Sequence, residues 1–75
     1  MQDPIQMRKK LGQRVRSLRE KAGLSQENFA YEKHFGRAFM SALENGKKDV
    51  RFSTLCKLAK AFNITLSDLV KGLGD

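Results

Sequence analysis

Side chains that could support covalent or metal chemistry are few in this sequence. It holds one cysteine, Cys56, and one histidine, His34, and no cysteine or carboxylate stands at a metal-ligand spacing from that histidine. The serines occur in no GxSxG motif, and neither an HExxH motif nor a phosphate-loop motif is present. We therefore expect no enzyme, no catalytic residue, no bound metal, no cofactor and no small-molecule ligand.

Basic side chains are a stronger signal. Fifteen Lys and Arg against eight Asp and Glu give a net charge of +7, which favours a polyanionic partner such as nucleic acid or an anionic membrane surface. Residues 1–24 carry seven basic and two acidic side chains, whereas residues 25–48 and 49–75 each carry four and three. Within the first segment, Arg8, Lys9 and Lys10 either contact flanking phosphates or form a solvated face.

The membrane alternative is the weaker one. No apolar run is long enough to cross a bilayer, and the first residues lack the apolar stretch of a secretory signal. A basic helix lying on the membrane surface is disfavoured because its apolar side has no Trp or Phe and is needed for the core. We expect a cytoplasmic protein with no membrane partner.

Residues 4–22 are predicted to form the first and longest helix. Asp3 can cap it and Pro4 suits its first position, while Gly23 suits its end. An apolar stripe recurs along it at steps of three or four residues, as expected of a helix packed on one side. The stripe consists of Met7, Leu11, Val15, Leu18 and Ala22.

Four shorter helices follow, at about 26–33, 37–44, 52–62 and 66–73. Ser25 can cap the first of them, and Thr65 opens a capping-box pattern before the last. No alternation typical of a strand and no internal repeat occurs. The sequence therefore predicts an all-α, compact five-helix bundle that forms a single domain over residues 1–75.

The stretch from Gln26 to Glu44 has a short helix, a three-residue break and another short helix. This is the layout of a helix-turn-helix, whose second helix can lie in the major groove of DNA. The residues here resemble the Cro and phage-repressor type (xenobiotic-response-element-like) helix-turn-helix family. The resemblance covers about residues 11–73 and rests on the strings Leu18–Glu27, Leu43–Lys47 and Leu55–Phe62.

This resemblance implies roles for residues in and around the motif. Gln26 matches a position where a side-chain amide and free N–H groups at a helix start hold a phosphate. Arg37 matches a groove-facing position, from which a guanidinium can donate two hydrogen bonds to guanine. The resemblance also implies groove-facing positions for Ala38, Ser41 and Ala42, and phosphate contacts for Asn45, Lys47 and Lys48.

Two further features follow from the resemblance. Arg19 and Glu44 match a pair that, in similar proteins, bridges the first helix to the groove-reading helix. Phe39 either touches the sugar–phosphate backbone or packs over the crossing of the two motif helices. The string Arg37–Ser41 also resembles the small controller proteins of restriction–modification systems, which regulate their own operon as dimers.

The sequence departs from the family pattern at three places. His34 stands at the turn position where the family needs the positive φ of a glycine, a conformation that histidine can adopt with some strain. Gly36 replaces the Ser or Thr that commonly caps the groove-reading helix. Val50 and Arg51 replace a frequent Pro-Ser before the fourth helix, so the start of that helix is less well defined.

Four side chains have plain structural interpretations. His34 is expected to be a turn residue rather than a pH switch. Cys56 is expected to be a half-buried small hydrophobic residue rather than a redox sensor. Lys57 and Lys60 are expected on the solvated face of the fourth helix.

The expected function is that of a sequence-specific, double-stranded DNA-binding transcriptional regulator, either repressor or activator. We expect an autoregulating homodimer on a palindromic operator. The alternative is an antitoxin or coactivator-like module whose last two helices bind a partner protein, and the two functions can coexist. Four apolar side chains either close the core or form a dimer contact: Leu66, Leu69, Val70 and Leu73.

Overall fold

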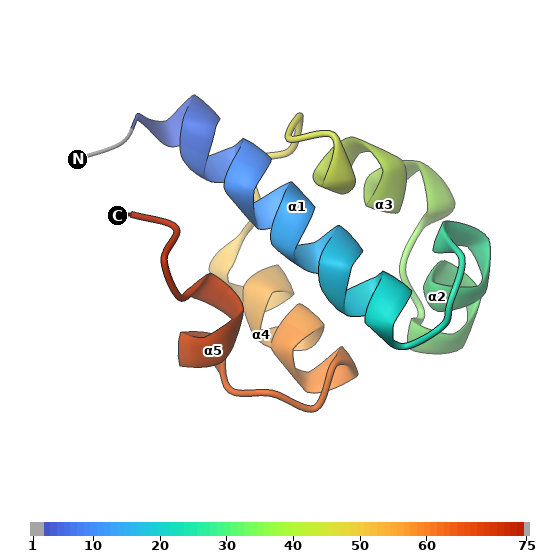
Figure 1. Ribbon diagram of the computed structural model, residues 1–75. Coiled ribbons are helices and arrows are strands. Elements are labelled where there is room, and N and C mark those ends of the chain that lie inside the picture. The colour runs from blue at the N-terminus through green and yellow to red at the C-terminus, as the bar shows by residue number, and fades with distance from the viewer. Residues whose placement is uncertain (1–2, 75) are drawn as a thin grey trace.

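Helix α1 (Pro4–Lys21) runs through the middle of the molecule, and shorter helices lie on either side of it (Figure 1). On one side lie α2 (Gln26–Lys33) and α3 (Arg37–Glu44), and on the other α4 (Phe52–Ala61) and α5 (Leu66–Val70). The computed structural model describes residues 3–74, so residues 1–2 and 75 of the predicted domain lie outside it. Within 3–74 all regular elements are helices, which confirms the all-α, five-helix prediction.

Side chains close the starts of three helices where the sequence patterns predict them. The carboxylate Oδ1 of Asp3 accepts a hydrogen bond from the backbone N–H of Gln6 at 2.9 Å. Ser25 and Thr65 accept in the same way, each at 3.0 Å, from the backbone N–H three residues further on. Each bond satisfies one of the backbone N–H groups that have no partner within the helix at its start. The first residues of α1, α2 and α5 are therefore determined by nearby residues in the sequence.

The ends of three helices come earlier than predicted. Both α1 and α4 stop one residue short, with Ala22 and Phe62 as their C-cap residues. The larger difference is at α5, which was expected to reach residue 73 but ends at Val70. Lys71 leaves the helical region with φ −58° and ψ 127°, and Gly72 follows with a φ of +82°. The segment after α5 therefore forms turns.

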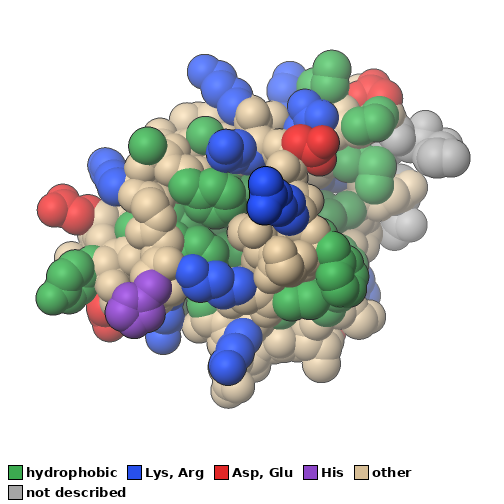
Figure 2. Space-filling view, turned by 180° about the vertical axis from the view of Figure 1, so that it is seen from behind, with side chains coloured by type: hydrophobic (Ala, Val, Ile, Leu, Met, Phe, Trp, Pro, Cys, Tyr) green, Lys and Arg blue, Asp and Glu red, His purple; other side chains and the backbone are tan. Residues whose placement is uncertain are grey.

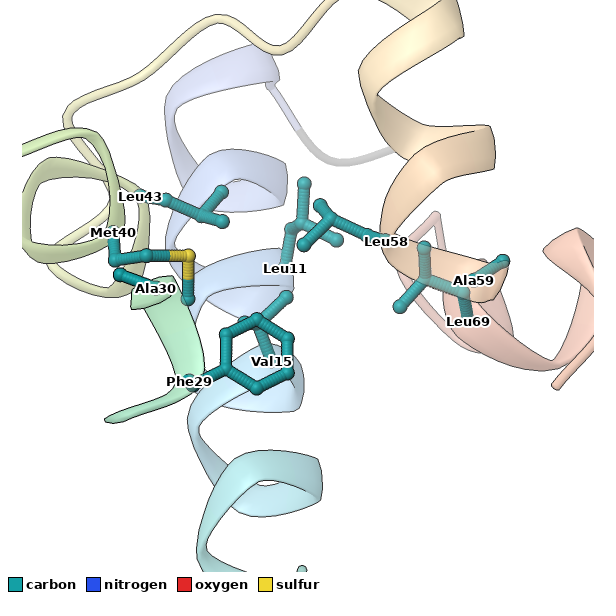
Figure 3. Close-up of a cluster of buried hydrophobic side chains, with 9 residues drawn as sticks. All are labelled: Leu11, Val15, Phe29, Ala30, Met40, Leu43, Leu58, Ala59 and Leu69. Carbon is teal, nitrogen blue, oxygen red and sulfur yellow. The ribbon is translucent and has the colours of Figure 1, made fainter. Parts of the chain in front are cut away.

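The core collects buried side chains from all five helices. Phe29, Met40 and Leu43 approach α1 from the side of α2 and α3, and Leu58 and Leu69 approach it from the other side (Figure 3). The prediction that Ala22 belongs to this core is wrong, because α1 ends before it and its side chain is exposed. The core residues are Leu11, Val15, Phe29, Ala30, Met40, Leu43, Leu58, Ala59 and Leu69.

None of the helices within residues 3–74 has both the length and the apolar character that a membrane-spanning helix requires.

The backbone of α1 lies very close to the end of α3 at Gly12. A Cβ atom at this position would lie 2.7 Å from the backbone oxygen of Glu44, and nearer still to that of Leu43. One turn earlier, the Cα of Lys9 would lie 2.9 Å from a Cβ on Gly46. The two glycines therefore allow α1 and the end of α3 to approach more closely than any larger residues would.

Substitution Gly12→Ala should lower the free energy of unfolding by about 1–3 kcal/mol, because the added methyl group would force α1 and α3 apart. Alanine ordinarily stabilises a helix relative to glycine by about 1 kcal/mol. A loss of stability in Gly12→Ala would therefore indicate the close approach of α1 and α3. Chemical denaturation measures it. The exposed neighbour Gln13→Ala is the control, and a Gly12→Ala protein as stable as wild type would contradict the packing described here.

Candidate nucleic-acid interface

The turn between α2 and α3 is built by three residues with distinct conformations. His34 ends α2 in the left-handed region (φ 60°, ψ 47°), as expected for a residue that replaces a glycine. The N–H of Phe35 donates to the carbonyl oxygen of Ala30 at 2.9 Å, which closes the last turn of α2. Gly36 then starts α3 in an extended conformation without a side-chain cap. The start of α3 therefore depends on packing more than on a local cap.

The two sides of α3 differ in burial. Met40 and Leu43 are 0% and 1% exposed and fix the inner side of the helix in the core. On the opposite side, Arg37 and Ala38 are exposed. Ser41 and Ala42 are half-buried, and Asn45, Lys47 and Lys48 are exposed after the helix. The structure thus presents one side of α3 and the loop that follows it to solvent.

Arg19 and Glu44 form a buried ion pair between α1 and α3. The guanidinium donates from Nε to Oε2 of Glu44 at 2.7 Å and from Nη2 to Oε1 at 2.9 Å. A third donor, Nη1, reaches the carbonyl oxygen of Leu24 at 2.7 Å. This two-point geometry fixes orientation as well as distance, so the end of α3 is held at a defined place on α1 and beside the start of α2.

Gln26 joins the same network from the first position of α2. Its side-chain Nε2 donates to Oε1 of Glu44 at 3.0 Å. An amide nitrogen carries two hydrogens, so one donor remains for another acceptor. The position implied to hold a phosphate is therefore coupled through Glu44 to the end of α3.

The electrostatics of the pair follow from these contacts. Burial alone would raise the pKa of the Glu44 carboxyl, but the hydrogen bonds from Arg19 and Gln26, with the charges of Arg19 and Arg16, lower that pKa below its ordinary value of 4.5. The hydrogen bonds that Arg19 donates to Glu44 outweigh the desolvation of Arg19, so the pKa of the guanidinium rises above its ordinary value. Both groups are charged at neutral pH.

Phe39 lies on the flank of α3 and takes part in a row of rings. Its ring stacks on that of Phe35 at a centroid distance of 6.0 Å, and Phe35 stacks on Phe29 in the core at 5.8 Å. The ammonium of Lys48 lies 5.9 Å from the Phe39 centroid. Phe39 is half-buried. Phe39 therefore packs against Phe35 of the turn, and its contact with the sugar–phosphate backbone stays a prediction.

The predictions about α4 have different outcomes. Lys57 is exposed, as predicted, but its Nζ also donates to the carbonyl oxygen of His34 at 2.6 Å and lies 4.3 Å from the ring centroid of Phe35. Cys56 is exposed rather than half-buried. Helical spacing within α4 places both residues outside the core, but only the path of the distant turn determines what Lys57 contacts.

The predicted dimer candidates divide into two groups. Leu69 is 0% exposed and belongs to the core, so it is not available to a partner. Leu66, Val70 and Leu73 are half-buried. Val70 and Leu73 line an open groove of about 250 Å³ between α1, the loop after α3 and α5. An accessible apolar surface therefore exists at the C-terminal helix, but it is smaller than predicted.

Basic side chains are spread over the surface rather than confined to α3. Figure 2 shows Lys and Arg side chains across one face of the molecule, with hydrophobic side chains between them. Arg8 forms an ion pair with Asp49 at 3.6 Å, and Arg16 forms one with Glu20 at 3.5 Å. Part of the positive charge of α1 is therefore paired within the molecule.

Comparison with known proteins supports one family. A helix-turn-helix domain model matches residues 12–74. The control protein C.MunI of Mycoplasma sp is 41% identical over 61 residues, covering 80% of this chain and 82% of that protein. The control protein C.BamHI of Bacillus amyloliquefaciens is 35% identical over 60 residues, covering 79% and 74%. The crystal structure of the restriction-modification controller protein C.AhdI from Aeromonas hydrophila superposes with a TM-score of 0.76 at 37% identity, covering 83% of this chain and 94% of that one.

Substitution Glu44→Gln should lower the free energy of unfolding by about 2–3 kcal/mol at neutral pH, because it leaves the Arg19 charge buried without a carboxylate. Since folding lowers the pKa of Glu44, its stabilising contribution is complete above about pH 4.5 and is lost as pH falls through the folded pKa. Denaturation of both proteins across this range measures the difference.

The exposed carboxylate of Glu32 supplies the matched control, Glu32→Gln, which should have little effect at any pH. The stability gap between wild type and Glu44→Gln should narrow in acid. A gap of equal size in acid and at neutral pH would contradict the assignment of a charged, stabilising Glu44.

Proposed function

This chain belongs to the helix-turn-helix family, and we propose that it is a sequence-specific, double-stranded DNA-binding transcriptional regulator. The observation that carries the proposal is the two-sided placement of α3. Its inner side is fixed by buried Met40 and Leu43 and by the Glu44 ion pair, while its outer side is open. A helix held in this way can enter the major groove without rearrangement.

Direct reading of bases falls mainly to Arg37. Its guanidinium is exposed at the first position of α3 and can donate to guanine O6 and N7, which discriminates against other bases by about 1–3 kcal/mol. Ala38 and Ala42 can offer only methyl contacts to thymine, and Ser41 can donate or accept. With so few specific donors, the shape and deformability of the DNA would contribute to the choice of site.

Phosphate contacts would flank this reading helix on both sides. On one side are the first backbone N–H groups of α2 and the remaining amide hydrogen of Gln26, which favour an anion at a helix start. On the other side, Asn45, Lys47 and Lys48 follow α3 with exposed side chains. Contacts on either side of α3 would fix its register in the groove.

The regulator is proposed to act as a homodimer on a palindrome. Two copies of α3 would then meet half-sites about 34–36 Å apart, one turn of DNA. The half-buried side chains of Leu66, Val70 and Leu73, together with the adjoining groove, supply an apolar surface for a second copy. The similarity to control proteins supports a restriction–modification controller. We propose that it regulates its own operon in the cytoplasm, without a cofactor or enzymatic activity.

The same α5 surface supports a second candidate function, an antitoxin or coactivator-like module that binds another protein. The two candidates differ in what occupies Val70 and Leu73. A stable heteromeric complex purified with this chain would favour the module, whereas a homodimer that binds one operator without a third component favours the controller. Both functions can operate in one protein.

Arg37→Ala is expected to weaken operator binding by about 1–3 kcal/mol and to relax the preference at one base position. Selection from random duplexes, followed by titration of the recovered site, measures both effects. Lys47→Ala provides the contrast, because loss of a phosphate contact weakens all sequences alike and reduces the salt slope by about 1. If Arg37→Ala weakens binding equally on all DNA sequences, Arg37 contacts a phosphate instead of a base. A selection with the wild-type protein that yields no sequence motif would refute the proposed function.

A charge in the α5 surface should separate the dimer. Leu73→Asp places a carboxylate in the apolar surface, so we expect a monomer by analytical ultracentrifugation and weaker binding to the palindrome. Thermal unfolding of the variant establishes that the monomer still folds. Tyr31→Asp, on an α2 side chain that is 84% exposed, is the control and should leave the dimer intact. A Leu73→Asp protein that folds and remains dimeric would place the interface elsewhere.

A further inference from the structure

We propose that Lys57 of α4 is a positioning residue for DNA recognition, which holds the turn of the helix-turn-helix and through it the start of α3. The proposal deepens the function proposed above and rests on it for its DNA readout. Lys57 lies outside the α2–turn–α3 unit in sequence and is not among the expected DNA contacts. Its ammonium nevertheless reaches that unit at the residue where α2 ends.

The contact made by Lys57 suits the end of a helix. The last carbonyl groups of a helix have no partner within it and carry partial negative charge, so a cation there is favourable. The ammonium of Lys57 is such a cation, because its Nζ donates to the carbonyl oxygen of His34 at 2.6 Å. It also lies 4.3 Å from the centroid of the Phe35 ring, a distance typical of a cation–π interaction. One side chain thus holds two successive residues of the turn.

The turn needs such support because its conformation is unfavourable for its residue. His34 adopts the left-handed region with φ 60°, where a side chain is strained. Strained backbone of this kind persists only where surrounding contacts determine it. The Phe35 N–H bond to Ala30 fixes the peptide on one side, and the Lys57 bond to the His34 carbonyl fixes it on the other.

Stacked aromatic rings connect the turn that Lys57 supports to α3. Phe35 stacks on Phe39, the third residue of α3, at a centroid distance of 6.0 Å and an interplanar angle of 10°. Because Gly36 provides no side-chain cap, this stack is a main support for the exposed first turn of α3, where Arg37 stands. The turn is open on this side: a hollow of about 190 Å³ lies between it and α4, lined by Thr54 and by the residues already named. Lys57 spans that hollow.

Three variants test the proposal. Lys57→Met keeps a side chain of similar length but removes its charge. Lys57→Arg keeps a positively charged hydrogen-bond donor at this position. Lys60→Met removes the same charge from an exposed position three residues further along α4 and controls for the general loss of attraction to DNA. Each full-length protein is examined by amide hydrogen exchange and by titration with the selected operator and with a random duplex at several salt concentrations.

Positioning predicts a local effect in the free protein. In Lys57→Met, exchange at the amide of Phe35 should be about tenfold faster while exchange at Val15 in the core is unchanged. Lys57→Arg should restore most of the protection, and Lys60→Met should resemble wild type. An equal acceleration at Phe35 and Val15 would overturn the proposal, because Lys57 would then support only global stability. Unchanged exchange at Phe35 would overturn it as well.

Positioning also predicts a selective effect on binding. Relative to Lys60→Met, Lys57→Met should bind the operator about tenfold more weakly, with the same salt slope and the same affinity for random duplex. A salt slope reduced by about 1, with equal loss on both duplexes, would identify a phosphate contact instead and overturn the proposal. Absence of any operator preference in the wild type would refute the proposed function, and the exchange data would still decide the role of Lys57.

Discussion

The buried ion pair between Arg19 and Glu44 is the contact on which the placement of α3 depends. An eight-residue helix is too short to be stable alone, and α3 begins at Gly36 without a side-chain cap. Its position must therefore come from tertiary contacts: apolar packing on its inner side, the two-point ion pair at its end, and the stacked rings at its start. Gln26 of α2 also donates a hydrogen bond to Glu44, so the proposed phosphate-binding position and the proposed groove-reading helix share one carboxylate. Replacing such a pair with apolar residues often costs little stability, and its value here is orientation.

Only part of the positive charge of the chain is available to bind DNA, because several basic side chains make contacts within the protein. Most of it lies on α1, yet several guanidinium groups of that helix serve the fold. Arg19 is buried in the ion pair, and Arg14 donates to the carbonyl oxygen of Asp68 at 3.0 Å, which ties α1 to α5. Arg8 and Arg16 have carboxylate partners at the surface, where such pairs are weak and screened by salt. The proposed base contact depends on Arg37, which contributes one charge. Net charge therefore indicates the class of partner, whereas the placement of single side chains determines what is read.

Local signals predicted most of the fold. Caps at Ser25 and Thr65 and the helical spacing of apolar residues located every helix start, because these interactions lie within a few residues of one another. Two features that no prediction covered depend on distant segments. The burial of Gly12 follows from the approach of α3, and the partner of Lys57 is a turn twenty-three residues away. The family resemblance supplied the pairing of Arg19 with Glu44, which no local pattern contains. The end of α5 at Val70 was missed although Gly72 was a signal for it.

Affinity cleavage can show whether α3 of a dimer enters the major groove. An iron chelate attached to Ser41→Cys, in a Cys56→Ser background, places the cleaving centre on α3. If α3 enters the major groove, the selected operator should be cleaved in two tracts one helical turn apart, about 10–10.5 base pairs between centres. The same chelate on Lys60→Cys of α4 should cleave these tracts weakly. Strong cleavage from α4 with none from α3, or cleavage spread evenly along the duplex, would contradict the account.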